Sequence, residues 1–168
     1  MKILFPENND ERIQQAVDTL NKEKICEAVL GNNDLKTAAT ELLDGKYDAV
    51  IAGATHTTAD VLRAGVKIVG TKNGLASSFM LIMHNNKTFA FADCAVNPSP
   101  SIEQLSEITM NTADNFYKLT KQVPIIALLS YSTLGSANGE IVEKMRAVKK
   151  LVNALRPELN IDGEIQFD

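Results

Sequence analysis

Short apolar runs alternate with amphipathic stretches along the first third of the chain. Residues 2–5, 25–30 and 47–52 are brief, apolar and partly β-branched, which predicts strands. Between them, apolar positions recur at helical spacing over 11–21 and 35–43. This order of strands and helices predicts a parallel sheet in an α/β fold.

A polar loop and a helix follow the third predicted strand. Loop 54–58 contains threonines and a histidine, and a helical pattern over 59–64 is expected to stop at Gly65. Thr57 or Thr58 can cap this helix through its hydroxyl group. The segment therefore predicts a strand, a polar loop and the start of a helix.

The start of this helix has the chemistry of an anion site. Free N–H groups at a helix N-terminus bind phosphate or carboxylate, and Arg63, about one turn further on, adds a cation. Asp60 lies in the first turn, where the helix dipole favours an anion. A ligand loop and an N-capped surface loop both fit this pattern.

The second half of the chain begins with a hairpin pattern. The apolar runs 78–83 and 88–93 flank an Asn-Asn turn, which predicts an antiparallel hairpin. A helix over 101–119 opens with Ser and Gln at the spacing of a capping box. The apolar run 123–129 then predicts a buried strand.

A second loop rich in hydroxyl groups and glycine follows this strand at 130–139, before a long helix over 140–155. Ser132, Thr133 and Ser136 lie at the junction and could again cradle an anion. The Gly-Lys-Ser/Thr signature is absent, so the loop is not a Walker loop. Two such loops in one chain favour a ligand cleft.

The predicted architecture is a three-layer α/β fold with a mostly parallel sheet and one antiparallel hairpin. We expect two lobes, 1–73 and 74–168, which could also pack as a single domain, with a turn at 71–74. Loops 54–58 and 131–139 are expected to face one another across a shared cleft, because parallel strands bring such junctions to one sheet edge. Residues 162–168 are expected to form a turn and a strand.

Composition excludes several classes of function. The formal net charge of −4 over 168 residues argues against nucleic acid or an anionic membrane as partner. No apolar run approaches a membrane span or a signal peptide, so we expect a cytoplasmic protein. Cys26 and Cys94 lack paired spacing and are expected to be reduced. His56 and His84 lack ligand spacing, so no metal site is expected.

Long ordered motifs carry a family resemblance. Nearly the whole chain resembles the phosphate acetyl/butyryl transferases, through KILFPENNDERIQQA at the start, AGATHTTADVLRAGVKIVGTKNG at 52–74, FADCAVNPSPSIEQLSEI at 91–108, LLSYSTLGSANG at 128–139 and RPELNIDGEIQFD at 156–168. The resemblance implies acyl transfer between acetyl-CoA and inorganic phosphate, giving acetyl phosphate and coenzyme A. It also implies an isocitrate/isopropylmalate-dehydrogenase-like fold around a cleft, a homodimer, and no permanently bound cofactor, since coenzyme A is a substrate.

The resemblance also implies roles for particular residues. Arg63 matches the arginine of the family's Thr-Ala-Asp-x-x-Arg motif, which binds a substrate anion. Thr57, Thr58, Ser132 and Thr133 match the cleft loops. The implied reaction needs cations for the phosphoryl oxygens and the developing oxyanion, and a base for the thiol of coenzyme A.

The sequence departs from the family in two places. Segment 31–46 is shortened, and the chain stops at Asp168, where the family continues into a Ser-Arg-Gly motif and a downstream aspartate that supplies the base. Asp93 or Asp60 could replace that aspartate. Three hypotheses stay open: an acyltransferase acting alone or with a separately encoded C-terminal half, a non-catalytic module that binds coenzyme A, phosphate or a partner, and a fragment of a longer protein.

Overall fold

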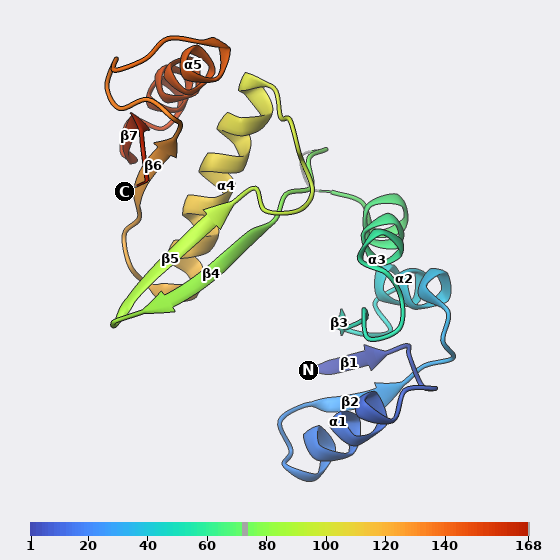
Figure 1. The fold of residues 1–168 in the computed structure, drawn as a ribbon. Helices are drawn as coiled ribbons and strands as arrows, with labels where there is room; N and C mark the ends of the chain where they lie inside the picture. The colour runs from blue at the N-terminus through green and yellow to red at the C-terminus, as the bar shows by residue number, and fades with distance from the viewer. Residues whose placement is uncertain (72–73, 168) are drawn as a thin grey trace. The chain divides into compact units, whose positions relative to one another are not determined.

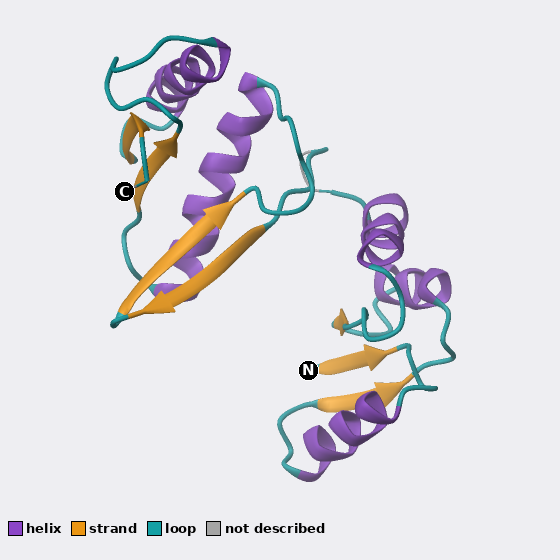
Figure 2. Ribbon diagram, in the orientation of Figure 1, coloured by secondary structure: helices purple, strands orange, loops and turns teal. Residues whose placement is uncertain are grey.

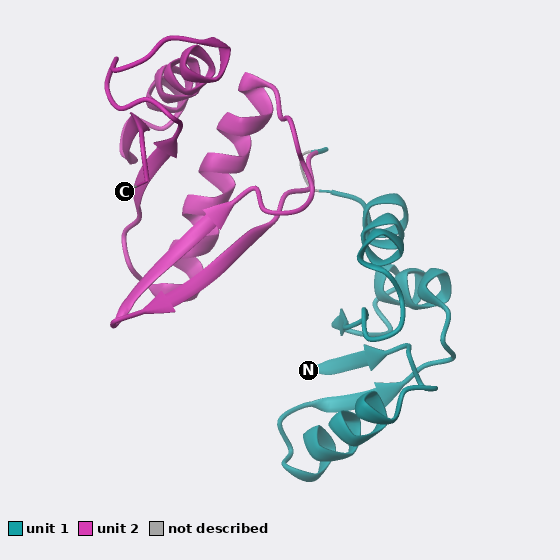
Figure 3. Ribbon diagram, viewed as in Figure 1, with its two compact units in different colours: residues 1–74 teal, residues 75–168 magenta. Residues whose placement is uncertain are grey.

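The computed structural model describes residues 1–71 and 74–167, and the chain divides into two compact units, 1–74 and 75–168 (Figure 3). The predicted turn at 71–74 includes residues 72 and 73, which lie outside the described residues. Whether the two predicted lobes, 1–73 and 74–168, are separate domains stays a prediction. Within the described residues, no helix is long and apolar enough to cross a membrane.

The first unit is a small three-layer α/β structure. Its elements in chain order are β1 (Lys2–Phe5), α1 (Glu11–Lys22), β2 (Glu27–Leu30), α2 (Leu35–Leu43), β3 (Ala49–Val50), α3 (Thr58–Ala64) and the π-helix η1 (Gly65–Val69). The strands form a parallel sheet in the order β2-β1-β3, as the alternation of elements predicted.

Alternate residues of β1 face the two helical layers of this unit. Ile3 and Phe5 pack in one cluster with Val17 of α1, whereas Leu4 packs in another with Ala38 of α2. Figure 1 shows α1 and α2 on the two sides of the sheet. The period-two pattern of a strand thus buries both faces of β1.

The strands of this sheet are shorter than expected. β2 begins at Glu27 because β1, its partner, begins at Lys2, which pairs with Glu27. β3 covers only Ala49 and Val50. The predicted strand over 47–52 is therefore wrong at its ends. The N–H groups of Asp48 and Ile51 still donate to carbonyl oxygens of β1, and the backbone turns toward a side chain only from Gly53 on.

The α-helix that begins at Thr58 ends at Ala64, as predicted, and Gly65 is its C-cap residue. Its φ and ψ of −58° and −55° are helical, and the chain continues through η1 to Gly70, whose φ is +84°. The chain does not leave the helical region at Gly65, because glycine tolerates it; a π-helix follows α3, and the positive φ at Gly70 ends that π-helix. Thr57 is the N-cap residue.

The second unit combines a hairpin, two helices and a parallel strand pair (Figure 2). Its elements are β4 (Phe79–His84), β5 (Lys87–Ala92), α4 (Ile102–Thr120), β6 (Ile125–Leu129), α5 (Glu140–Leu155) and β7 (Asn160–Ile165). The antiparallel hairpin is confirmed, with positive φ at both turn asparagines, and so is the capping box of α4. Leu128, Val148, Val152 and Ile161 form one buried cluster of its core.

Gly163 lies inside β7, so the turn expected at the start of 162–168 is wrong. Its backbone pairs with Leu128 of β6. A Cβ at position 163 would lie 2.7 Å from the carbonyl oxygen of Leu128, and φ there is +139°. The glycine therefore marks a close approach of two strands, which sequence alone does not separate from a turn.

Candidate functional site

The first hydroxyl loop is wrapped around the carboxylate of Glu7. Four consecutive backbone N–H groups donate to its two oxygens, from Gly53, Ala54, Thr55 and His56, at 3.0, 2.9, 2.8 and 2.8 Å. Glu7 follows β1 after Pro6, whereas the donors follow β3. Because β1 and β3 are adjacent and parallel, both junctions lie at the same sheet edge.

Two side chains complete the shell around Glu7. The hydroxyl of Thr55 donates at 3.1 Å, and Nδ1 of His56 lies 2.9 Å from the same carboxylate oxygen. Glu7 itself is 1% exposed. Burial alone would raise the pKa of Glu7, but hydrogen bonds from the backbone of loop 53–56 and from the His56 ring outweigh it and hold that pKa well below its usual range. Glu7 is therefore ionised at neutral pH.

The backbone N–H groups of loop 53–56, which were predicted to bind a ligand, thus donate to the protein's own Glu7 carboxylate. At the start of α3, the Thr57 hydroxyl accepts from the backbone N–H of Asp60 and donates to its carboxylate at 2.7 Å. Arg63 donates to the other oxygen of Asp60 at 2.7 Å, and both side chains of this pair are exposed. Thr58 is the first residue of α3 and is exposed.

A shallow groove of about 480 Å³ opens beside this loop, between α2, α3 and η1. Three cationic side chains line it, from Lys36, Arg63 and Lys67, together with His56. Asp34 and Asp60 also line it, but the Asp34 carboxylate caps α2 by accepting from the N–H groups of residues 36 and 37. The side chains of the groove, more than the backbone of the loop, provide the chemistry for holding an anion.

The sequence prediction found Arg63 and Asp60 but missed the two lysines of the groove, Lys36 and Lys67. Lys67 lies four residues after Arg63, a spacing that places two helical residues on one face. Lys36 comes from a separate helix, and no local pattern connects it to Arg63. Glu7 and the ring of His56 were likewise missed, because their contact joins residues that are far apart in the sequence.

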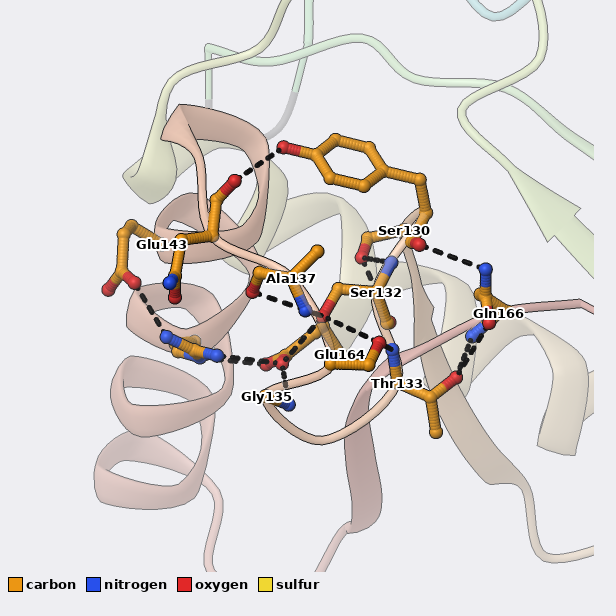
Figure 4. Close-up of polar contacts among 12 residues, drawn as sticks. Ser130, Ser132, Thr133, Gly135, Ala137, Glu143, Glu164 and Gln166 are labelled. Carbon is orange, nitrogen blue, oxygen red and sulfur yellow. Dashed lines mark hydrogen bonds and ion pairs between the residues drawn. The ribbon is translucent and has the colours of Figure 1, made fainter.

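The second hydroxyl loop is held by Glu164 of β7 (Figure 4). Its carboxylate accepts from Gly135 N–H at 2.8 Å and from Nε and Nη2 of Arg146 at 3.0 Å each. Glu164 is 2% exposed. The Arg146 guanidinium is the main cause that lowers the pKa of Glu164 to about 2.

The hydroxyl groups of this loop bond mainly within the loop. Ser132 is fully buried, and its Oγ accepts from Ala137 N–H at 3.0 Å. Ser136 Oγ accepts from Thr133 N–H at 2.9 Å, and Thr133 Oγ1 accepts from Gln166 N–H at 2.9 Å. These contacts fix the loop conformation. Substrate contacts by Ser132, Thr133 and Ser136 stay a prediction, as does the cleft shared with loop 54–58, because the structure defines each unit by itself.

Asp93, one of the two candidate bases, is also enclosed by donors. It follows β5, and its carboxylate accepts from the hydroxyl of Ser78 and from the backbone N–H groups of Ala95, Val96 and Asn97. Burial raises its pKa, but the Ser78 and Asn97 side chains and the backbone donors outweigh burial, so the pKa of Asp93 lies well below its usual range. A carboxylate so strongly stabilised in its ionised form is a weak proton acceptor.

The Glu164 contacts generate a prediction for stability against pH. The pKa of Glu164 is lowered from 4.5 to about 2 on folding, so its stabilising contribution is complete above pH 4.5 and disappears as the pH falls to about 2. Because protonated Glu resembles Gln, Glu164→Gln should unfold more easily than wild type at neutral pH, and this difference should vanish near pH 2. Urea unfolding across this pH range measures it.

Glu143→Gln is the matched control for this experiment. Glu143 also contacts Arg146, at 2.6 Å, but its side chain is 63% exposed, and exposed pairs contribute at most about 1 kcal/mol. We expect a small difference from wild type at every pH. A Glu164→Gln deficit that persists undiminished at pH 2 would show that the carboxylate charge is not what holds the loop.

Comparisons with known proteins agree on one family. The family model described as phosphate acetyl/butaryl transferase matches residues 31–168. The chain is 40% identical over 139 residues to the phosphate acetyltransferase of Clostridium acetobutylicum, covering 78% of this chain and 42% of that protein. It is 31% identical over 225 residues to that of Bacillus subtilis, covering 100% of this chain and 69% of the relative. The latter alignment is longer than the chain, so that relative has internal residues that this chain lacks.

Solved structures give the same result. A phosphotransacetylase from Streptococcus pyogenes superposes with a TM-score of 0.86 at 29% identity, and the EutD phosphotransacetylase from Staphylococcus aureus with 0.80 at 27%. Both comparisons cover 100% of this chain and 69% of the other. The chain spans only about two fifths of the length of the Clostridium acetobutylicum relative. Since the family model matches most of its length, the chain belongs to the phosphate acetyl/butaryl transferase family.

Proposed function

We propose that this chain is a phosphate acyltransferase, which exchanges an acyl group between acyl-CoA, such as acetyl-CoA, and inorganic phosphate. The observation that carries this proposal is the basic groove beside loop 53–56, with Lys36, Arg63 and Lys67 on its walls. Membership of the family supports the reaction class. Because the chain spans only part of the relatives it matches, the activity is a proposal for this chain.

The groove suits the anionic partner of this reaction. Acyl phosphate and inorganic phosphate carry charge on several oxygens, and a guanidinium can donate two parallel hydrogen bonds to them. Asp60 holds Arg63 in position at 2.7 Å, so the guanidinium is oriented before a ligand arrives. Lys36 and Lys67 add two mobile cations. Cations placed here would stabilise the negative charge that develops during acyl transfer.

The second candidate function is binding of coenzyme A, phosphate or a partner without turnover. The observation that favours it is the state of both predicted bases. Asp93 is surrounded by donors, and Asp60 is bonded to Thr57 and Arg63. The Thr57 hydroxyl and the Arg63 guanidinium lower the pKa of Asp60, which makes it a poor acceptor for a thiol proton. A separately encoded C-terminal half belongs to the acyltransferase hypothesis instead, since it would complete a split enzyme.

On sequence grounds, we propose that the protein is cytoplasmic.

We also propose that it forms a homodimer. Val123 and Ile125 are 78% and 83% exposed, and both line an apolar cavity of about 510 Å³ bounded by β5, α4 and β6. Near the end of the chain, Phe167 adds exposed apolar surface at 74% exposure. Glu164 adds none, since it is charged and only 2% exposed. Exposed strands with large apolar side chains favour association. Sedimentation velocity should show a dimer at micromolar protein; a monomer alone would contradict the proposal.

Thiol release is the direct test of the proposed reaction. The isolated protein, given acetyl-CoA and inorganic phosphate, should release free thiol at a rate that depends on both substrates. Calorimetric titration with coenzyme A belongs to the same experiment. Binding without thiol release would support the second candidate function, whereas neither binding nor release would refute both.

Arg63→Ala separates a ligand arginine from a surface arginine. The substitution removes a charge-assisted hydrogen bond from the groove, and because the side chain is 59% exposed we expect the low end of the usual range, about a tenfold loss of affinity for acetyl phosphate. Lys22→Ala is the control, since it removes one positive charge from an exposed position of the same unit outside the groove. Equal affinities of the two variants would exclude Arg63 from the site.

A further inference from the structure

His56 is held in one orientation by a buried carboxylate and lines the basic groove at the same time. Its Nδ1 lies 2.9 Å from Glu7, its side chain is 23% exposed, and Glu7 is almost fully buried. Its backbone N–H donates to the same carboxylate at 2.8 Å. Two bonds to one carboxylate fix both the backbone and the ring, which is more than a surface histidine requires.

The partner of Nδ1 determines where the ring proton resides. Glu7 is ionised, and an ionised carboxylate can only accept hydrogen bonds. The contact therefore requires a proton on Nδ1, which in the neutral ring leaves the lone pair on Nε2. A buried carboxylate that holds a histidine in this tautomer is the arrangement that makes imidazole an effective proton acceptor in hydrolases.

The other charged groups of the groove line the same walls as this ring. Lys36 of α2, Arg63 of α3 and Lys67 of η1 line the same groove, with Asp34 and Asp60 as the carboxylates. An anion held by these cations would lie beside His56. The two predicted aspartates are occupied by other donors, so His56 is the proton acceptor that the groove itself supplies.

We propose that His56 is the general base of the acyl transfer and that Glu7 is its positioning residue. This inference rests on the proposed acyltransferase function. Nε2 takes the proton from the thiol of coenzyme A, and the thiolate sulfur forms a bond to the acyl carbon of the acyl phosphate. The carbon–oxygen bond to phosphate breaks, the electron pair stays on the phosphate oxygen, and the imidazolium returns the proton to that phosphate. The reverse reaction uses the same steps backwards.

Alkylation of bound coenzyme A tests the base without requiring turnover. At neutral pH only a few per cent of a free thiol is thiolate, so a base at the thiol should raise its reaction rate with iodoacetamide about tenfold under saturating wild-type protein. Mass spectrometry of the coenzyme A adduct separates this reaction from that of the protein cysteines. His56→Gln should abolish the increase while coenzyme A still binds, and His84→Gln, at the end of the hairpin, should leave it unchanged.

Ring nitrogen NMR tests the positioning role of Glu7. Wild type should show the Nδ1-protonated tautomer of His56, and Glu7→Gln should raise the Nε2-protonated population, which loss of packing alone would not do. If thiol release is absent but alkylation depends on His56, the proposed acyl transfer is refuted, whereas the assignment of His56 as the base of the thiol is supported. If thiol release proceeds equally well in wild type and His56→Gln, or the wild-type ring is Nε2-protonated, the inference is overturned.

Discussion

The carboxylate of Glu7 organises the first unit, because a buried charge must be satisfied by donors from the surrounding chain. Removing an unpaired carboxylate from water costs several kcal/mol, and here four backbone N–H groups, one hydroxyl and one imidazole offset that cost. The last backbone bond to β1 comes from Ile51, and from Gly53 on the loop curls around the Glu7 side chain. The same turn sets the start of α3 and the ring of His56, and so one wall of the basic groove.

The second unit fixes its loops by the same physical means with different partners. Glu164 of β7 accepts a hydrogen bond from loop 130–139 and forms an ion pair with Arg146 of α5. Asp93 accepts hydrogen bonds from the backbone N–H groups that follow β5. Glu7 and Glu164 lie outside the loops that they order, and Asp93 is the first residue of its loop. Carboxylates in these positions are therefore structural, which explains why neither an acidic residue at a strand end nor a hydroxyl-rich loop is by itself evidence of catalysis.

Local signals in the sequence were sufficient for much of the fold. Helices α2 and α5 begin and end where they were predicted, because their apolar stripes, and for α2 the Asp34 cap, are encoded within a few residues. The hairpin follows from its Asn-Asn turn. Gly163 was misread, since a glycine can lie in a turn or in a close strand contact. For the site, the position of Arg63 in α3 was predictable, but the contact between Glu7 and loop 53–56 was not, because it spans 46 residues from Glu7 to Gly53.

Amide hydrogen exchange of loop 53–56 in Glu7→Gln tests the central claim most directly. A glutamine side chain has one accepting oxygen in place of two and presents N–H groups to the loop donors. If each charge-assisted bond contributes about 1.5–3 kcal/mol, exchange at these four amides should rise by roughly 10- to 150-fold over wild type. Glu11→Gln, an exposed change in the first turn of α1, should leave them as protected as before. Equal protection in Glu7→Gln and wild type would contradict the account.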